Sequence, residues 1–445
     1  MVESSVASKP SRSGAQLCPE PARSIVSHTP LRQLIKIVWP AWCIAVLLPL
    51  YAVRYSLPGS RPVRTWPWFR TVLLQWVKAF RGGLHRVSDS NVSEQHLTLK
   101  GLRLGDAETT AKTKHSGTTT RAVWMDAVNV HDIKGELKRW LDATQDKLIK
   151  VPGYWYGLGH SGDVQAKSDE LVLLVFHGGG YALGTAYSSD FTSSIVQGIL
   201  KASIVKSAQG DCKNGSGQAR FSMPTRALSV DYRLSSSATL AGILADALAG
   251  YLYLVDKCGF TPEQIVIVGD SAGAHLTTTL VRYLRDTEVR PPPRGVVLIS
   301  PWSDLSMSWY FEGEGAKRNI PIDFLSDGLT HVRDVVVRRL PLDAIEGPYI
   351  APVTRAKSRQ PIVDESVFKN FPPALVLLGG RERLVDEIEE LVKVYKAGVG
   401  QDNVQLHTEP EGAHDFLALR RLGLFKEEFD RTTAKVADWL WDLTA

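Results

Sequence analysis

Near the middle of the chain, a run of strand-forming residues is followed at once by a serine between two glycines and then by a helical pattern. The stretch reads VIVGDSAGAHL over residues 266–276. Gly269-x-Ser271-x-Gly273 has the form of a nucleophile elbow, in which the turn from strand to helix is so tight that only glycine fits beside the serine. Because a G-x-S-x-G pattern also occurs by chance, the flanking strand and helix patterns are what make Ser271 a candidate nucleophile.

Short apolar runs alternate with helical patterns from about residue 120 to the C-terminus. Each run is bounded by Gly, Pro, Asp or Ser. Continuous apolar strands that alternate with helices predict an α/β fold with a mostly parallel central sheet flanked by helices. The runs are 171–176, 227–230, 265–268, 296–299, 374–378 and 404–406, and the clearest helical patterns are 240–256, 274–285, 384–395 and 425–443.

The length and composition exclude several classes of protein. At 445 residues the chain is long enough for one large α/β domain plus extra segments. No nucleic-acid-binding signature accompanies the formal charge of +5, so this mild basic excess fits a membrane surface better than nucleic acid. Cys18, Cys43, Cys212 and Cys258 are scattered without a C-x-x-C, so we expect neither a disulfide framework nor a metal site.

The N-terminal region has a different composition from the rest. Residues 1–35 are rich in Ser, Pro and Arg, which predicts a disordered tail. An uncharged run follows from Ile37 to Val53, between Lys36 and Arg54. We interpret residues 36–57 as a membrane anchor, single-pass or at least monotopic, with an apolar helix packed on the domain as the alternative.

Three further segments interrupt the α/β pattern. Residues 58–120 comprise an amphipathic helix over 66–80 and a polar linker, and we predict the α/β domain proper over 121–445. That helix suits the membrane interface, a cover over the active site, or packing on the domain. We predict that residues 306–347 form a helical cap over the strand ends. We predict that residues 206–224 form a polar surface insertion. The apolar face of the amphipathic helix comprises Phe69, Leu73, Trp76, Val77 and Phe80.

Two N-glycosylation sequons, at Asn91 and Asn214, lie in polar stretches after the predicted anchor. They favour a lumenal or external catalytic domain. Basic residues flank both sides of the anchor, so charge does not decide its orientation.

A serine hydroxyl needs an imidazole to accept its proton, an acid to orient that imidazole, and donors for the developing oxyanion. HGGG, residues 177–180, directly follows an apolar run. Three successive glycines let backbone N–H groups converge, so Gly178, Gly179 and Gly180 form a candidate oxyanion hole. A phosphate-binding loop is the alternative, but the chain has no G-K-[ST] and no suitably placed G-x-G-x-x-G. We expect His177 to brace this loop.

The general base should follow a late strand. His414, in EGAHDF after the run that begins at 404, meets that requirement. His275 follows the elbow on a helix, His331 lies in the predicted cap, and His407 lies within a strand pattern, so all three are weaker candidates.

The acid should follow the preceding strand. Glu382 stands in the turn after the run 374–378, whereas Asp386 comes one turn into the next helix. The resulting order Ser271, Glu382, His414 is the order typical of α/β-hydrolases.

Together these motifs resemble the hormone-sensitive-lipase family of α/β-hydrolases, which includes arylacetamide deacetylase. The resemblance covers residues from about 170 to 440, and it implies a carboxylic ester hydrolase without cofactor or metal. It further implies backbone oxyanion donors at Gly179, Gly180 and Ala272, and a cap built from N-terminal residues and the 306–347 segment. The motifs are HGGG at 177–180, DYRL at 231–234, GDSAG at 269–273, SPWSDL at 300–305 and GAHDF at 412–416.

One position departs from the family pattern. The family usually has D-P-L-x-D after this strand, with the first Asp as the catalytic acid, whereas this chain reads ERLVD over 382–386. We therefore predict Glu382 as the acid and Asp386 as the alternative.

An anchor ahead of such a domain resembles the endoplasmic-reticulum deacetylases, including fungal steryl acetyl hydrolases. The resemblance implies a membrane protein that hydrolyses short-acyl esters of hydrophobic alcohols. The alternatives are a receptor on the same fold, like the plant gibberellin receptors, and amide hydrolysis or acyl transfer. In those receptors the catalytic histidine is replaced, whereas His414 is present here. The sequence does not indicate an oligomeric state.

Overall fold

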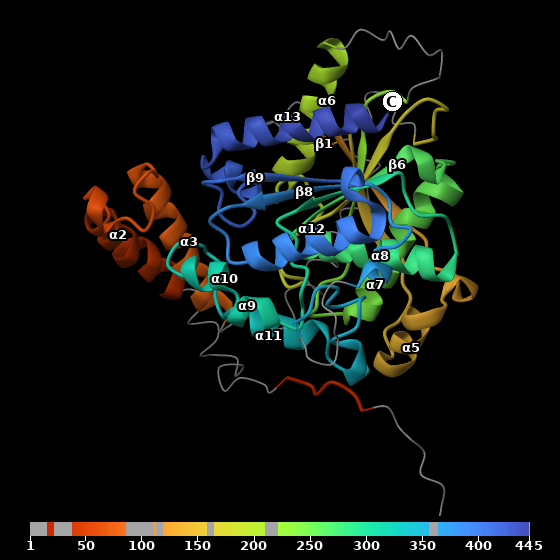
Figure 1. The fold of residues 1–445 in the computed structure, drawn as a ribbon, viewed down its shortest axis with the longest axis horizontal. Helices are drawn as coiled ribbons and strands as arrows, with labels where there is room; N and C mark the ends of the chain where they lie inside the picture. Colours follow the sequence, from red (N-terminus) through yellow and green to blue (C-terminus); the bar gives the residue numbers. More distant parts are fainter. Residues whose placement is uncertain are drawn as a thin grey trace, which may run out of the picture.

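A nine-stranded sheet runs through the centre of the computed structural model, with helices on both faces (Figure 1). The structure describes residues 16–21, 38–85, 111–112, 119–157, 164–209, 221–355 and 364–444. The two sequons at Asn91 and Asn214, together with Cys212 and most of the predicted tail, lie outside these ranges.

Six neighbouring strands of the sheet are parallel, as the sequence predicted. Their order is β5-β4-β6-β7-β8-β9. All residues of the first five are buried, since helices cover both faces of these apolar runs, whereas only the two end residues of the edge strand β9 are buried. The strands are β4 (Val172–Phe176), β5 (Ala227–Val230), β6 (Ile265–Asp270), β7 (Gly295–Ile299), β8 (Ala374–Gly379) and β9 (Val404–Glu409).

Three antiparallel strands that the sequence patterns did not predict extend the other edge. They are β1 (Ala111–Lys112), β2 (Thr119–Met125) and β3 (Val151–Tyr156), and β3 pairs with β5. Pro152 and Gly153 conceal the signal of β3, because both residues are uncommon in strands. Gly153 pairs with Val230, and an added Cβ would lie 3.2 Å from Leu228 Cδ1, so a close neighbouring strand favours glycine here.

Helices cover the sheet in two layers (Figure 1). On one face α6 packs against α13, and on the other lie α5, α7, α8 and α12. The four helices that the sequence predicted most clearly are confirmed. The bounds are α5 (Gly135–Thr144), α6 (Ser193–Gln209), α7 (Leu240–Leu252, continued by a π-helical turn Tyr253–Lys257), α8 (Ala272–Thr287), α12 (Val385–Val399) and α13 (Lys426–Leu443). Short 3₁₀ turns are Pro58–Ser60, Val130–Asp132, Pro262–Gln264, Leu342–Ala344, Glu365–Val367, Gln401–Asn403 and Ala418–Leu422.

The segment 306–347 contains three short helices, α9 (Ser308–Glu312), α10 (Glu314–Arg318) and α11 (Gly328–Val336). Side chains of α11 and of the stretch before it line the pocket at Ser271, so this segment covers the ends of the strands. We refer to residues 306–347 as the cap.

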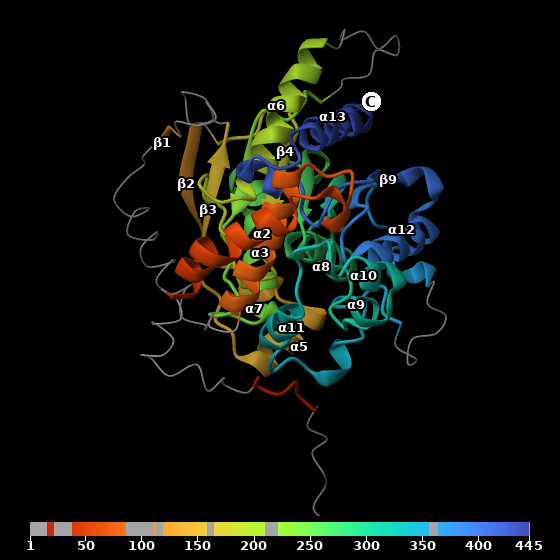
Figure 2. The ribbon, with the colours of Figure 1, turned by 90° about the vertical axis from the view of Figure 1, so that its left-hand side faces the viewer.

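Residues 38–85 form a helical hairpin at one side of the domain (Figures 1 and 2). Its first arm contains a π-helical turn, Cys43–Leu47, and α2 (Leu48–Arg54), and its second arm is α3 (Trp68–His85). None of the helices in the described ranges has the length and apolar character needed to cross a membrane. On α3, Phe69 of the predicted apolar face is 46% exposed, whereas Val72 and Leu74, which lie outside that face, are buried.

Candidate active site

Ser271 stands at the junction between β6 and α8 in a strained conformation, with φ 52° and ψ −115°. Such backbone costs on the order of 1–3 kcal/mol and persists only where the surroundings impose it. An added Cβ on Gly269 would lie 2.3 Å from Gly273 O, and one on Gly273 would lie 2.0 Å from Phe176 O. Both glycines are therefore required for the turn that directs Ser271 out of the sheet.

His414 and Glu382 complete a hydrogen-bonded relay with this serine. The Nε2 atom of His414 lies 2.9 Å from Ser271 Oγ, and its Nδ1 lies 2.8 Å from Glu382 Oε2. All three side chains are buried, and they follow the carboxyl ends of three parallel strands, β6, β8 and β9. The structure thus brings together the three residues proposed from the sequence.

Glu382 is fully buried, and its second oxygen has its own donors. Oε1 accepts hydrogen bonds from Gly379 N (2.7 Å) and Ser300 Oγ (3.2 Å). Burial raises the pKa of Glu382, the nearby Asp323 carboxylate raises it further, and these two hydrogen bonds oppose the change. With Nδ1–H of His414 as a third donor, every contact made by this carboxylate suits the ionised acceptor.

The glycine loop after β4 lies beside Ser271. Gly179 and Gly180 have φ of 108° and 65°, values open chiefly to glycine, and an added Cβ on Gly179 would lie 2.2 Å from Leu183 O. Within the described part of the chain, the N–H groups of Gly179, Gly180 and Ala272 have no protein acceptor. Ala272 is the first residue of α8, where the helix dipole also favours negative charge.

Gly178 requires a correction. Its N–H donates to Asp270 Oδ2 at 2.9 Å, so it is engaged within the protein and is not an oxyanion donor. Burial raises the pKa of Asp270, as does the neighbouring Asp415 carboxylate. Asp270 immediately precedes Ser271, so this hydrogen bond anchors the glycine loop to the elbow.

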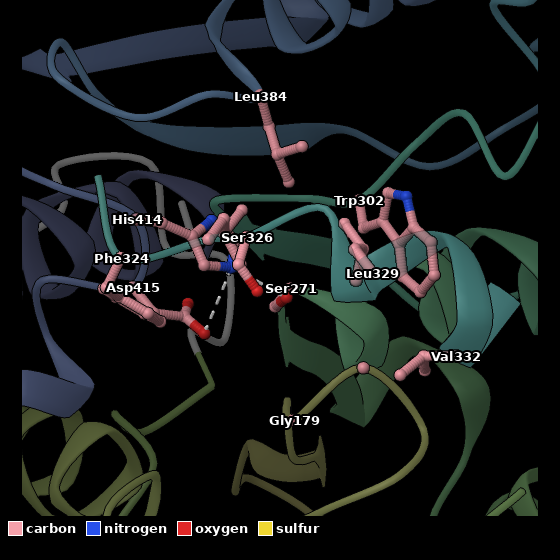
Figure 3. A pocket seen from close by; sticks show the side chains of 12 residues that line it. Gly179, Ser271, Trp302, Phe324, Ser326, Leu329, Val332, Leu384, His414 and Asp415 are labelled. Carbon is pink, nitrogen blue, oxygen red and sulfur yellow. Dashed lines mark hydrogen bonds and ion pairs between the residues drawn. The ribbon is translucent and has the colours of Figure 1, made fainter. Parts of the chain in front are cut away.

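A pocket opens at these groups. Figure 3 shows Ser271 near its centre, His414 and Asp415 on one side and Trp302 on the other. Most of the remaining wall is apolar and comes from the cap. The lining residues are Gly179, Gly180, Ser271, Trp302, Phe324, Leu325, Ser326, Leu329, Val332, Leu384, His414 and Asp415.

Comparison with known proteins agrees with this fold. A family model described as alpha/beta hydrolase fold matches residues 217–418. An esterase of the bacterial hormone-sensitive lipase family is 20% identical with a TM-score of 0.53, and the match covers 84% of this chain and 97% of that one. The hyperthermophilic esterase of Pyrobaculum calidifontis is 17% identical with a TM-score of 0.54, and its match covers 84% and 98%.

Relatives by sequence have ester-hydrolase names. The chain is 28% identical to an acetyl-hydrolase of Streptomyces hygroscopicus over 52% of its own length and 64% of the relative's. For the steryl acetyl hydrolase 1 of Saccharomyces cerevisiae the identity is 26%, over 38% and 34% of the two lengths. The chain thus spans less than two thirds of either relative.

The chain has the α/β-hydrolase fold, and it is similar to ester hydrolases of the hormone-sensitive-lipase type. In this structure, the alternative acid Asp386 has partners other than His414. Its Oδ1 accepts from Gly315 N at 3.1 Å and its Oδ2 from Ala316 N at 2.7 Å, so it caps the start of α10. The structure therefore contradicts Asp386 as the partner of His414.

The remaining histidines have other environments. His177 stacks on Tyr232 with ring centroids 4.3 Å apart, which braces the glycine loop. His275 lies between Tyr181 Oη (2.6 Å) and Ile350 O (3.0 Å), and burial lowers its pKa to about 4, so it stays neutral. His331 lies on α11 and His407 on β9, as the sequence suggested.

Sequence reasoning missed a carboxylate from the cap. Asp323 is fully buried and accepts backbone N–H groups of Phe324 (2.7 Å), Arg383 (2.7 Å) and His414 (3.4 Å). One side chain thus joins the cap, the acid turn and the histidine loop. No local pattern marks Asp323, because its partners lie far along the chain.

Ser300 and Asn319 were missed for the same reason. Besides donating to Glu382, Ser300 Oγ accepts from Asp415 N at 3.1 Å. Asn319 Nδ2 donates to Glu382 O at 2.8 Å. Both residues fix the acid turn relative to its neighbours. In the described ranges, no group of three or more His, Cys, Asp or Glu side chains is arranged to bind a metal ion.

Proposed function

We propose that this protein is a serine carboxylic ester hydrolase with Ser271 as nucleophile, His414 as general base and Glu382 as the acid. The observation that carries the proposal is the continuous relay from Ser271 Oγ to His414 Nε2 (2.9 Å) and from His414 Nδ1 to Glu382 (2.8 Å). This relay also favours an enzyme over a receptor on the same fold, since a receptor needs no base at hydrogen-bonding distance from the serine.

In the first half of the reaction, Ser271 Oγ attacks the ester carbonyl carbon while His414 Nε2 takes the hydroxyl proton. The carbonyl oxygen becomes negatively charged and accepts hydrogen bonds from the N–H groups of Gly179, Gly180 and Ala272. Glu382 stabilises the imidazolium that forms. When the tetrahedral intermediate collapses, His414 donates the proton to the alkoxide, and the alcohol leaves an acyl group on Ser271.

In the second half, a water molecule gives its proton to His414 and attacks the acyl carbonyl carbon. The same three N–H groups stabilise the second oxyanion. His414 then returns the proton to Ser271 Oγ, which releases the carboxylic acid and restores the free enzyme.

For the substrate we propose short-acyl esters of hydrophobic alcohols, with acetylated sterols as one such class. The apolar cap side chains Phe324, Leu325 and Leu329 support a hydrophobic substrate. The names of the relatives, acetyl-hydrolase and steryl acetyl hydrolase, support a short acyl group. A membrane location through residues 36–57, in the endoplasmic reticulum with the hydrolase domain lumenal, remains part of this proposal.

The test is replacement of the nucleophile. We expect Ser271→Ala to lower kcat for p-nitrophenyl acetate by about 10⁴-fold or more and to abolish labelling by a fluorophosphonate. Ser237→Ala, at a serine whose hydroxyl donates to Leu234 O, is the control and should retain both. Unchanged hydrolysis by Ser271→Ala would exclude the assignment, and an unlabelled wild type would favour a receptor.

Substrate and location have their own measurements. A panel of acetylated sterols, simple acetates and longer esters, tested on the wild type, should show preference for the short acyl group. Glycosidase treatment should shift the mobility of the protein from cells if Asn91 or Asn214 faces the lumen, and an unshifted band would contradict that orientation.

A further inference from the structure

We infer that the hairpin of residues 38–85 binds the surface of an anionic phospholipid bilayer and places the mouth of the active site at that surface. This inference rests on the proposed function in one respect only, which is that the bound enzyme would reach esters dissolved in the bilayer. The binding surface itself rests on exposure, hydrogen bonding and charge within the hairpin.

Exposed apolar side chains gather on this hairpin. Of the 20 large hydrophobic residues that are exposed in the described ranges, nine lie within residues 38–85. Val53 is 74% exposed and Leu57 70%, values that a soluble surface rarely shows for several neighbouring residues. The nine are Val38, Trp42, Ile44, Val46, Leu50, Val53, Leu57, Trp68 and Phe69, and we call them the outer patch.

The opposite side of the first arm is fixed to α3. Trp76 Nε1 donates to Cys43 O at 3.0 Å, and Trp68 Nε1 donates to Ala52 O at 3.0 Å. Cys43 and Leu47 are buried on this inner side. Because one side of the arm is occupied by α3, its apolar outer side faces away from the domain. Figure 1 shows α2 as the outer arm and α3 between it and the rest of the molecule.

The charge of the hairpin identifies the occupant. Residues 38–85 contain six basic residues and no acidic one. Two of the six face the domain, since Arg70 pairs with Glu428 and Lys78 donates to Ile320 O. Arg54, which directly follows the apolar stretch, and Arg64 are both exposed. Basic residues beside an apolar patch suit anionic headgroups, and exposed Trp side chains suit the boundary between headgroups and acyl chains. A second copy of the chain fits less well, since a two-fold contact would bring two basic patches together.

The hairpin also contacts both walls of the active site. On one side Gln75 Nε2 donates to Pro321 O at 2.9 Å, in the cap close to Asp323. On the other, Trp66 Nε1 donates to Glu411 O at 3.1 Å, in the loop that carries His414. Figure 1 shows α3, the inner arm, beside the cap helix α10. A bilayer bound to the outer patch is therefore joined through α3 to the segments that enclose Ser271, and this brings hydrophobic esters in the lipid near the site.

The test uses a matched pair of valines in the full-length protein. Val53 lies in the outer patch, whereas Val130, which is 78% exposed, lies in a 3₁₀ turn before α5. Sedimentation with vesicles of phosphatidylcholine and phosphatidylserine should show binding by the wild type and by Val130→Asp. Val53→Asp should reduce it about tenfold or more, because a carboxylate is strongly disfavoured in the interface. Added salt, or vesicles of phosphatidylcholine alone, should weaken binding by the wild type.

Two activity measurements separate this inference from the proposed function. Val53→Asp should hydrolyse water-soluble p-nitrophenyl acetate like the wild type, but should hydrolyse a sterol acetate held in the vesicles about tenfold more slowly. The inference would be overturned if both valine variants bound vesicles equally, or if the wild type did not bind them. It would also be overturned if the protein formed a dimer without lipid and Val53→Asp dissociated that dimer. If the wild type binds vesicles as expected but hydrolyses neither ester, the proposed function is wrong, whereas the assignment of the outer patch as a membrane-binding surface is still supported.

Discussion

The two sides of the catalytic relay are fixed by different forces. On the nucleophile side, Gly269, Gly273 and the glycine loop leave no room for a Cβ, so backbone contacts set the position of Ser271. On the acid–base side, His414 and Glu382 are placed by polar side chains, Asp323 from the cap and Ser300 from the end of β7. The first side depends on the shape of the backbone, and the second depends on charge and hydrogen bonds between distant segments.

This difference explains why the acid can depart from the family pattern while the elbow does not. A longer side chain at 382 is accommodated, because Gly379 N and Ser300 Oγ still reach its carboxylate. No comparable adjustment is available at Gly273, whose neighbour is the carbonyl oxygen of Phe176. We expect the two sides to respond differently to substitution.

After loss of the nucleophile itself, the largest effect should come from the acid. Glu382→Gln should lower kcat/KM for a soluble acetate ester by about 10³–10⁴-fold, because an amide can donate to His414 Nδ1 and so select the wrong tautomer. Steady-state kinetics at neutral pH measure this loss, with circular dichroism to verify the fold. A loss of less than tenfold would mean that another residue acts as the acid.

On the nucleophile side, Gly273→Ala should lower kcat by about 10²-fold or more, because the new Cβ displaces the serine. It should also lower the free energy of unfolding by about 2–3 kcal/mol. Gly59→Ala is the control, since an added Cβ there meets nothing within 4 Å. Activity assays and denaturant unfolding provide both readouts, and an active, stable Gly273→Ala would show that the elbow is not sterically fixed.

A smaller effect on kcat is expected from replacement of Asp323, the buried carboxylate of the cap. Asp323→Asn should reduce kcat about tenfold, because its amide group cannot accept from both Arg383 N and His414 N. The sign of the pH effect follows from charge: Asp323 raises the pKa of Glu382, so its removal lowers that pKa. Catalysis requires ionised Glu382, and the acid limb of the pH–kcat/KM profile should therefore move to lower pH.

The matched variant for this measurement is Asp327→Asn, which changes a cap carboxylate that is mostly exposed and pairs with Arg383. Its acid limb should stay at the wild-type pH. A shift of equal size in both variants would attribute the effect to the overall charge of the cap and not to Asp323.

The smallest effect on activity should come from Asp386. Asp386→Asn should change kcat/KM by no more than about threefold, because this residue caps α10 and does not contact His414. Thermal unfolding should show a lower Tm by a few degrees, since one of the two backbone acceptors becomes an amide donor. If Asp386→Asn impaired catalysis more than Glu382→Gln, the assignment of the acid would be reversed.

Much of the fold could be predicted from local patterns. The six parallel strands and the four clearest helices follow from continuous apolar runs and helical periodicity, because burial on both faces requires apolar residues throughout. The antiparallel edge could not be predicted, since Pro152 and Gly153 hide β3. The buried side of α3 could not be predicted either, because contacts with the domain decide which of its residues are buried.

For the site, the elbow, the glycine loop and His414 could be identified because each motif is contiguous. The distinction between Gly178 and its two neighbours could not, since it depends on a hydrogen bond to Asp270, 92 positions away. The role of Asp323 could not be predicted either, because it depends on hydrogen bonds to Arg383 and His414, which are far along the chain.

The sequence by itself determined the kind of chemistry that this chain can support, because glycine sterics and strand–helix alternation act over a few neighbouring residues. Only the tertiary structure decided which carboxylate faces His414, which glycine N–H groups are available, and which side of the hairpin is apolar and exposed. Those choices depend on contacts between segments far apart in the chain, and their energies arise only when the folded backbone brings the segments together.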